Sequence, residues 1–404
     1  MQRIENQLNR WNRGTTAIFF ARGLRGIADG FVAVLLPVYL LAMGLGGVAV
    51  GAIATATLLG SALATLMVGA CGHRWSARAL LLAAAMLMAA TGLGFAVASS
   101  FWILLLVAFL GTVNPSSGDV SVFLPLEHAQ LANTADAATR THLFARYALI
   151  GSLCAALGAL GSGLPDRLMA GLAMDRLVAM RAMFVLYALI GITIWFAYRS
   201  LPTPTGPEHA SKPTPLGPSK SVVVRLAALF CVDSFAGGLV VNSLMALWLF
   251  QTFGLSLASA GAFFFASGLL GAFSQMAAPR LAKHIGLVNT MVFTHIPASL
   301  CLIAAAFAAD VRWALGLLLV RAMVSSMDVP ARSAFVMSVV QASERAAAAS
   351  FTAVPRSLAA AASPLLAGWL FQSGWPAAPL VACGVLKIGY DLALWRAFRR
   401  TEIG

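Results

Sequence analysis

A series of long apolar stretches constrains this chain more than any other feature of its sequence. Each runs for roughly 20 residues or more, about the length of a helix that crosses a bilayer. Apolar residues make up 60% of the 404 residues and charged residues only 10%, against about a quarter charged in soluble domains. The stretches do not alternate between apolar and polar residues, and a helix satisfies its own backbone hydrogen bonds in lipid. The sequence therefore favours an all-α integral membrane protein over a β-barrel.

Polar breaks divide the apolar sequence into twelve expected transmembrane helices. They cover residues 15–41, 46–70, 79–98, 101–124, 141–164, 177–198, 222–252, 256–279, 287–308, 312–337, 346–371 and 376–397. Between the sixth and seventh, residues 200–220 are rich in proline and polar residues, which is typical of a flexible linker. The pattern predicts an N-terminal six-helix bundle at 1–198, a cytoplasmic Pro-rich linker at 199–221 and a C-terminal six-helix bundle at 222–404.

The distribution of basic residues predicts the orientation of the chain. With both termini in the cytoplasm, 17 of the 27 Lys and Arg residues fall on the cytoplasmic side and four on the other, as retention of basic loops requires. We therefore expect a multi-pass protein of the cytoplasmic (inner) membrane, with the lipid bilayer as its surroundings. The net charge of +13 follows from this bias, so no nucleic-acid partner is expected. The five cysteines are isolated, and neither a metal nor another cofactor is expected.

The two halves of the chain resemble each other. Residues 116–120 (Ser-Ser-Gly-Asp-Val) match 325–329 (Ser-Ser-Met-Asp-Val) 209 residues later, and residues 28–32 match 236–240 at an offset of 208. The spans after the first match align at an offset of 205. Six spans in each half give both halves the same orientation, which predicts two pseudo-symmetric bundles around a central cleft. Such a cleft suits alternating exposure of a small solute, so a transporter is favoured over an enzyme.

The loop after the second expected span carries a family signature. Residues 69–78 read Gly-Ala-Cys-Gly-His-Arg-Trp-Ser-Ala-Arg, which resembles the Gly-x-x-x-Asp-Arg-x-Gly-Arg-Arg signature of the major facilitator superfamily (MFS). Gly69, Arg74 and Arg78 match that signature, whereas His73 replaces its acidic residue. A weaker copy after the eighth span places Lys283 before His284 and ends at Gly286.

The resemblance covers nearly the whole chain and implies the MFS fold of twelve helices in two pseudo-symmetric bundles. It also implies secondary transport by a monomer. In the family, this loop locks the two halves through charge pairs on the cytoplasmic face. Anchoring of the topology is the alternative role for Arg74, Arg78 and Lys283.

Ionisable residues within the apolar stretches are the candidate functional residues, because such groups are costly in a bilayer unless they have a partner or face water. Arg22, Arg25 and Asp29 share one face of the first span, and Asp233 in the seventh span aligns with Arg25. The resemblance implies that these two spans line a central cavity, so Arg25 and Asp233 are expected to face each other. We expect Asp29 or Asp233 to bind and release a proton as its surroundings alternate.

The remaining polar residues within spans fall into three groups. Arg321, Asn114 and Asn242 join Arg25, Asp29 and Asp233 as candidates for substrate binding or proton coupling. Asp119 with Arg146, and Asp328 with Arg356, are candidate ion pairs that fix helix packing or gate the cytoplasmic side, with direct ligand contact as the alternative. Lys387 and Asp391, four residues apart in the last span, are expected to be structural.

Three functions remain open on the sequence. Proton-coupled efflux of a small solute is expected first. An uptake symporter or facilitator for a small organic anion is the alternative, since arginines exceed aspartates by one among the central charges. A transport-inactive membrane sensor or scaffold is the third. An enzyme is not expected, because the histidines show no catalytic spacing and no phosphate-binding loop is present.

Overall fold

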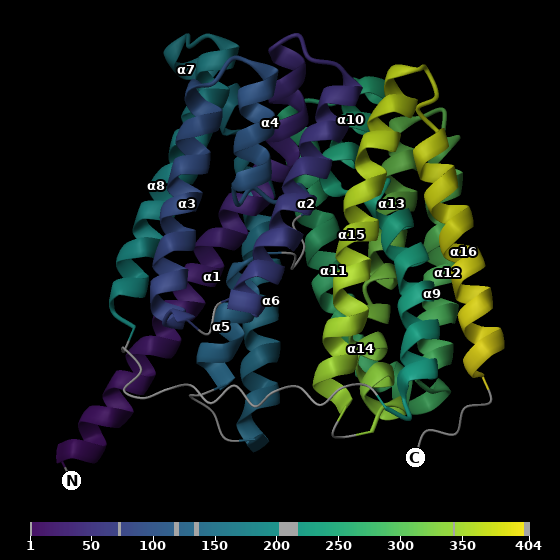
Figure 1. The fold of residues 1–404 in the computed structure, drawn as a ribbon. Coiled ribbons are helices and arrows are strands. Elements are labelled where there is room, and N and C mark those ends of the chain that lie inside the picture. The colour runs from purple at the N-terminus through teal and green to yellow at the C-terminus, as the bar shows by residue number, and fades with distance from the viewer. Residues whose placement is uncertain are drawn as a thin grey trace. The chain divides into compact units, whose positions relative to one another are not determined.

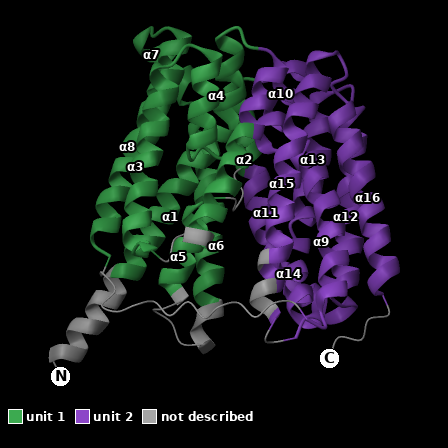
Figure 2. Ribbon diagram, in the orientation of Figure 1, with its two compact units in different colours: residues 1–45, 56–210, 256–265 green, residues 46–55, 211–255, 266–404 purple. Residues whose placement is uncertain are grey.

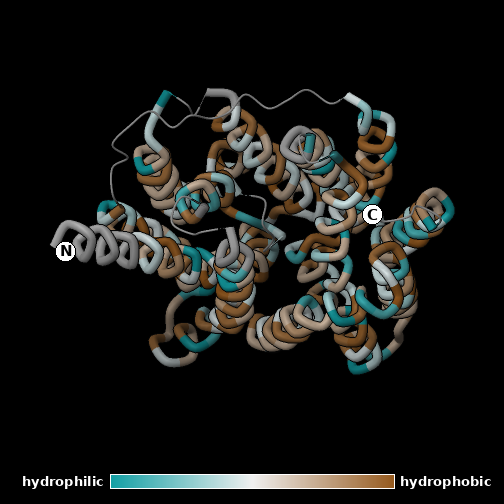
Figure 3. Tube along the Cα trace, turned by 90° about the horizontal axis from the view of Figure 1, so that it is seen from below, coloured by the Kyte–Doolittle hydropathy of each residue, from teal (hydrophilic) through white to brown (hydrophobic). Residues whose placement is uncertain are grey.

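The computed structural model describes residues 2–71, 74–116, 121–132, 137–201, 217–341 and 344–399. Every regular element in these ranges is a helix (Figure 1), which confirms the all-α fold. The Cα trace in Figure 3 is coloured as hydrophobic along much of its helical length. Ten helical segments in the described ranges are long and apolar enough to cross a membrane.

Two of the twelve expected spans have no counterpart among these ten segments. The expected span at 101–124 begins as a short apolar helix, α4 (Phe101–Leu110), which ends at Gly111. The expected span at 346–371 is covered by α15 (Arg345–Gln372), which is long enough but contains Arg356 and several serines. Those polar residues lower its mean hydropathy, which explains why it is not among the ten.

The chain divides into two compact units (Figure 2). Unit 1 comprises residues 1–45, 56–210 and 256–265, and unit 2 comprises 46–55, 211–255 and 266–404. The division at 210 lies within the expected linker. Residues 46–55 of the N-terminal half are grouped with unit 2, and residues 256–265 of the C-terminal half are grouped with unit 1. As a result, α2 (Gly47–Cys71) and α11 (Leu257–Ile285) each contribute to both units.

Unit 1 is built around the packing of its first helix. It contains α1 (Gln2–Ala42), α3 (Ala77–Val97), α4, α5 (Phe123–Ala132), α6 (Ala137–Gly161), α7 (Leu164–Leu172) and α8 (Arg176–Arg199). Helix α1 packs against α6 and α8, and α3 packs against α8. A Cβ atom on Gly26 would lie 2.8 Å from the carbonyl oxygen of Gly151, and one on Gly30 would overlap the carbonyl oxygen of Ala155. Small residues therefore allow the α1 and α6 backbones to approach closely.

Unit 2 repeats this packing with different helices. It contains α9 (Lys220–Gly238), α10 (Asn242–Phe253), α12 (Leu287–Ala306), α13 (Val311–Ser325), α14 (Asp328–Val339), α15 and α16 (Ala378–Phe398). Helix α9 packs against α15 and α16, and α12 packs against α13 and α16. A Cβ atom on Gly238 would overlap the carbonyl oxygen of Ala360. Gly238 follows Gly30 by 208 residues and Ala360 follows Ala155 by 205, so the same close approach occurs in both units and supports the internal duplication.

The seventh and tenth expected spans are broken helices. Helix α9 ends at Gly238 and α10 begins at Asn242, whereas α13 ends at Ser325 and α14 begins at Asp328. Broken helices at membrane depth need protein or water to satisfy their free backbone groups. In transporters such breaks are common near binding sites.

Glu344 connects the starts of α9 and α15. Its carboxylate accepts hydrogen bonds from the backbone N–H groups of Gly217, at 2.8 Å, and Ser219, at 3.1 Å. Ser219 is the N-cap residue of α9 and Glu344 is the N-cap residue of α15. A negative charge at a helix N-terminus is favourable, so this carboxylate ties the end of the linker to the rest of unit 2.

Candidate functional site: two buried charge networks

Arg25 on α1 is the centre of a buried network in unit 1. Its guanidinium lies 2.6 Å from the Glu127 carboxylate on α5 and also donates hydrogen bonds to the hydroxyls of Tyr147, at 3.1 Å, and Tyr198, at 3.2 Å. Both tyrosine hydroxyls donate in turn to Glu127. The guanidinium carbon also lies 4.2 Å from the ring centroid of Phe123, close enough for a cation–π interaction.

Arg25 and Glu127 compensate each other's charge, and the two tyrosine hydroxyls add hydrogen bonds to both. The side chains of Arg25 and Glu127 are 3% and 0% exposed, and burial of charged groups is tolerated when they are paired and hydrogen-bonded. Arg25 is one of the residues that the sequence identified. Glu127, Tyr147 and Tyr198 were missed, because the expected fourth span ends at residue 124 and the tyrosines resemble ordinary core residues.

Asp233 on α9 is the centre of a second network, in unit 2. Its Oδ1 lies 2.6 Å from Lys387 Nζ on α16, and its Oδ2 lies 3.0 Å from a guanidinium nitrogen of Arg332 on α14. Arg332 also pairs with Asp328, four residues earlier on the same helix. Two carboxylates and two cations thus form one continuous chain.

The chain continues from Lys387 to a histidine and a third carboxylate. Lys387 Nζ lies 3.2 Å from Nε2 of His295 on α12, and His295 Nδ1 lies 3.1 Å from Oδ1 of Asp391 on α16. Asp391 is fully buried, and its Oδ2 makes no hydrogen bond with the residues that the structure describes. Lys387 and Asp391 therefore contact different helices, α9 and α12, and the expectation that they are structural stays a prediction.

The central ion pairs of the two units occupy related positions with opposite charges. Arg25 on α1 and Asp233 on α9 are 208 residues apart, and Glu127 on α5 and Arg332 on α14 are 205 apart. These offsets are those of the internal repeat. In unit 1 the cation is on the first helix, whereas in unit 2 the anion is on the equivalent helix.

Ion-pair partners differ from those expected. Asp328 pairs with Arg332 instead of Arg356, because the four-residue spacing on α14 already places that guanidinium beside it. Arg356 donates from Nε to Ser234 Oγ at 3.2 Å on α9. Arg146 is exposed, and its expected partner Asp119 lies outside the described residues.

Arg25 and Asp233 belong to different units, and each has an ion-pair partner within its own unit. Their expected approach across a central cavity stays a prediction. Asp29, one turn beyond Arg25 on α1, is partly buried.

Arg321 on α13 differs from the other candidate arginines. It is partly buried and forms no ion pair or hydrogen bond with any residue in the described ranges. The titratable groups closest in electrostatic influence are the thiols of Cys383 on α16 and Cys301 on α12. A cationic group without a protein partner at this depth suits an anionic ligand.

The two candidate asparagines lie at helix breaks. Asn114 is buried just after α4, where its Oδ1 accepts hydrogen bonds from the backbone N–H of Ser116 at 3.0 Å and from the Ser116 hydroxyl at 2.7 Å. This Asx turn gives Asn114 a local structural role. Asn242 is the partly buried first residue of α10, in the broken seventh span.

The signature residues have mixed roles. Gly69, Arg74 and Lys283 are exposed, whereas Arg78 donates to the carbonyl oxygen of Arg199 at 2.7 Å, at the C-terminus of α8. Gly286 caps α12 with a φ of +86°, a conformation that glycine adopts without strain. His73 lies outside the described residues.

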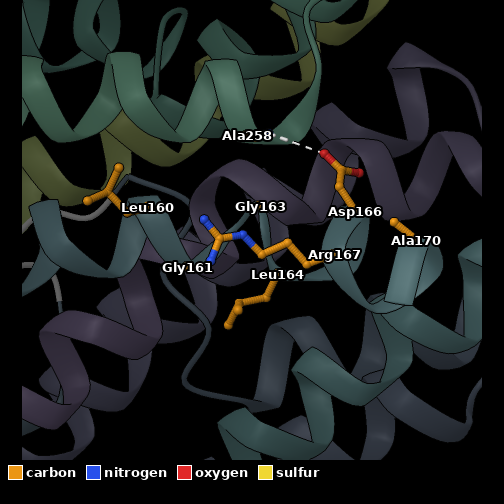
Figure 4. A pocket seen from close by; sticks show the side chains of 8 residues that line it. All are labelled: Leu160, Gly161, Gly163, Leu164, Asp166, Arg167, Ala170 and Ala258. Atoms are coloured by element: carbon orange, nitrogen blue, oxygen red, sulfur yellow. Dashed lines mark hydrogen bonds between the residues drawn. The ribbon is translucent and has the colours of Figure 1, made fainter. Parts of the chain in front are cut away.

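A cavity of about 520 Å³ lies at the ends of α6 and α7 in unit 1. Figure 4 shows Asp166 and Arg167 among its lining residues, with Asp166 accepting a long hydrogen bond of 3.4 Å from the backbone of Ala258. None of the candidate residues from the sequence lines this cavity, so the two buried networks remain the stronger candidate site.

Comparison with known families decides the class of the protein. The family model described as Major Facilitator Superfamily matches residues 18–353, most of the chain. The chain belongs to the Major Facilitator Superfamily. It is therefore a multi-pass membrane transporter, and the family resemblance of its loop signature is confirmed.

Solved structures of MFS proteins share this fold. The nucleoside transporter NupG aligns with a TM-score of 0.72 at 14% identity, over 97% of this chain and 100% of that one. The inward-open xylose transporter XylE from E. coli aligns with a TM-score of 0.72 at 14% identity, over 95% and 96%. The human organic anion transporter MFSD10 (TETRAN) aligns with a TM-score of 0.64 at 18% identity, over 95% and 99%.

A sequence relative of this MFS chain is found in yeast. The uncharacterized membrane protein YJR124C of Saccharomyces cerevisiae is 22% identical over 406 residues, which cover 92% of this chain and 91% of the relative. The match extends over nearly the full length of both proteins. Both are membrane proteins, and the relative's name assigns it no substrate.

Proposed function

We propose that this MFS transporter exports a small solute from the cytoplasm across the inner membrane by alternating access, in exchange for protons. The single observation that carries proton coupling is the chain of ionisable groups in unit 2. Buried carboxylates there are paired with cations, on other helices in the case of Asp233 and on the same helix in the case of Asp328, so adding a proton to one of them changes which contacts are favourable. Rocking of the bundles would then be linked to protonation.

Asp233 supports this proposal most directly. It binds Lys387 on α16 and Arg332 on α14 at the same time, and therefore connects three helices of one unit. A change in the charge balance around it would alter contacts among all three. Asp29, partly buried on α1, is the corresponding candidate in unit 1.

Arg321 favours a second candidate function, uptake or facilitated diffusion of a small organic anion. A guanidinium binds carboxylate or phosphate groups through a fixed pair of hydrogen bonds, and Arg321 has no protein partner in the described ranges. One structural neighbour is named as an organic anion transporter, whereas others are named for nucleosides and xylose. Substrates of these three classes form the first panel to test.

The test uses purified protein in liposomes that contain a pH-sensitive dye. Radiolabelled uridine, xylose and succinate are added in turn, and flux of the label and internal pH are recorded together. Coupled transport predicts that one solute moves and that protons move in the opposite direction. The variants Asp233→Asn and Asp29→Asn should then reduce proton movement, while Asp310→Asn, an exposed capping residue of α13, should not.

Other outcomes separate the alternatives. Proton movement in the same direction as the solute would indicate a symporter, and solute flux with no pH change would indicate a facilitator. Saturable binding of a panel solute without flux would support the sensor or scaffold. Any of these three results would contradict export in exchange for protons.

A further inference from the structure

His295 is held between a cation and a carboxylate in a way that fixes the position of its proton. Lys387 Nζ lies 3.2 Å from its Nε2, and Asp391 Oδ1 lies 3.1 Å from its Nδ1. A charged lysine has only hydrogen-bond donors, so Nε2 must accept from it. Nδ1 therefore carries the proton and donates to Asp391, and the imidazole is neutral.

Asp391 is the least compensated carboxylate of the unit 2 network. Asp233 contacts two full cations and Asp328 contacts Arg332. Asp391 instead has one neutral imidazole, is completely buried, and has no hydrogen bond at Oδ2 within the described residues. A buried charge with so few partners is expensive, so Asp391 gains most from being neutralised by a proton.

We propose that Asp391 binds the transported proton, that His295 delivers it, and that release of Lys387 from His295 signals its arrival to Asp233. This inference rests on the proposed proton-coupled transport and names its proton site. The transported proton is then held by a residue of the last helix, and Asp233 takes part in coupling through its contact with Lys387.

The transfer balances as a relay through the imidazole. A proton from hydronium forms an N–H bond at Nε2 of His295, and the proton on Nδ1 moves to Oδ1 of Asp391. The carboxylate becomes a neutral carboxylic acid, and the imidazole remains neutral but with its proton on Nε2. Release runs the same steps in reverse into the opposite compartment.

The change of tautomer is what connects proton binding to the rest of the unit. Once Nε2 carries a proton, it can no longer accept a hydrogen bond from Lys387, because both groups are then donors. Lys387 must leave His295, and Asp233 becomes its sole hydrogen-bond partner in the network. The Lys387–His295 contact between α16 and α12 is lost, the His295–Asp391 contact remains with Asp391 now donating to Nδ1, and the contact between α9 and α16 is strengthened.

Titratable and charged groups lie around this relay on every helix of unit 2 that packs near it, and Asp233 and Lys387 are the ones beyond His295 that influence Asp391 most. The groups are His295 on α12; Cys383, Lys387 and Tyr390 on α16; Asp233 on α9; Arg356 on α15; Asp328 and Arg332 on α14; and Arg321 on α13. The cations face mainly Asp233 and Asp328, whereas Asp391 meets the neutral histidine. Its proton affinity therefore depends on whether Lys387 is near or far.

The first test detects the proton without any substrate. Infrared difference spectra between acidic and alkaline buffer are recorded on wild type, Asp391→Asn and the control Asp310→Asn in liposomes. Wild type and the control should show the C=O stretch of a protonated buried carboxyl, and Asp391→Asn should lose part of that band. An unchanged band in Asp391→Asn overturns the proposal.

The second test measures coupling with whichever of uridine, xylose and succinate the wild type transports. Asp391→Asn should abolish solute-driven proton movement but keep solute exchange between loaded liposomes and medium at equilibrium. His295→Gln should have the same effect on coupling but should retain the carboxyl band. If Asp391→Asn folds poorly, His295→Gln provides the test in its place. Normal coupling in Asp391→Asn overturns this inference alone, whereas a wild type that moves solute without protons overturns the proposed function with it.

Discussion

Glu127 on α5 lies 2.6 Å from Arg25 on α1, although 102 residues separate them in the chain. The pair fixes a short helix after the fourth expected span against the first. Its counterpart in unit 2, Asp233 with Arg332, has a separation of 3.0 Å. The charged residues that the bilayer disfavours are thus used to connect helices within each bundle, and the predictions below follow from individual contacts.

Removing one partner of the unit 1 pair should be more harmful than removing both. Glu127→Gln leaves the buried Arg25 charge without its carboxylate, which costs roughly 3–5 kcal/mol. The double variant Arg25→Gln/Glu127→Gln should be less unstable than the sum of its single variants. Thermal unfolding in detergent measures all three, and strictly additive losses would show that the two residues do not interact.

The unit 2 network should depend more on Arg332 than on Lys387. Arg332→Gln removes the cation paired with Asp328 and one of the two cations paired with Asp233, whereas Lys387→Gln leaves both carboxylates paired with Arg332. We expect a loss of about 3–5 kcal/mol for the arginine variant and a smaller one for the lysine variant. Unfolding midpoints at one pH and one detergent concentration compare them directly. Equal losses would mean that Asp328 needs no cation.

Glu344 should stabilise unit 2 in a pH-dependent way. A hydrogen bond with the Ser219 side chain, opposed by a smaller effect of desolvation and aided by the backbone N–H groups of Gly217 and Ser219, holds the pKa of Glu344 below its ordinary value. A carboxyl group with a lowered pKa in the folded state adds stability that is complete above its unfolded pKa. That stability is lost as the pH falls through the folded pKa.

The variant Glu344→Gln tests this sign. It should unfold at a lower temperature than wild type at neutral pH, and the difference should shrink as the pH falls below the ordinary range of a glutamate pKa, about 4.3. A difference that stays constant over this range would indicate that the carboxylate charge is not the stabilising feature.

Gly238 should not tolerate a methyl group, because a Cβ atom there would overlap the carbonyl oxygen of Ala360. Gly238→Ala is expected to cost about 1–3 kcal/mol through overpacking of α9 against α15. The neighbouring Gly237 has no atom within 4 Å of its Cβ position, so Gly237→Ala is the matched control. Thermal unfolding that ranks the control below Gly238→Ala would contradict the close approach.

Arg321 should affect ligand binding without affecting stability. Because the Arg321 side chain forms no ion pair or hydrogen bond with the described residues, Arg321→Gln removes no polar contact with them. If the substrate is an organic anion, loss of a charge-assisted hydrogen bond of about 1.5–3 kcal/mol lowers succinate affinity by roughly tenfold or more. Scintillation proximity binding measures this change, and unchanged affinity would contradict an anion contact at Arg321.

The sequence identified Arg25 and Asp233 because an ionisable residue within an apolar stretch is conspicuous. It could not identify their partners, which depend on which helices pack together. Glu127 falls three residues beyond the expected end of the fourth span, yet α5 extends to Ala132 and buries it. Arg332 was counted with the cytoplasmic loops, although its four-residue spacing from Asp328 could have indicated a pair.

The relay of Asp391 and His295 was also missed, for a different reason. Asp391 and Lys387 have the spacing of an ordinary helical ion pair, which predicts that they satisfy each other. In the structure Lys387 extends to Asp233 and Asp391 turns to His295, because long side chains choose among partners on several helices. Periodicity places residues on a helix, but tertiary packing decides which groups share a proton or a charge.

The reversed polarity of the two central pairs makes the halves of this protein non-interchangeable. If α5 were transplanted into the place of α14, Glu127 would stand against Asp233, and two anions would meet where opposite charges now attract. The reciprocal exchange would set Arg332 against Arg25. Ancestral duplication supplied two similar scaffolds. A chimera keeps its ion pairs when a whole half is copied, because both partners move together. An exchange of single helices between the halves does not keep them.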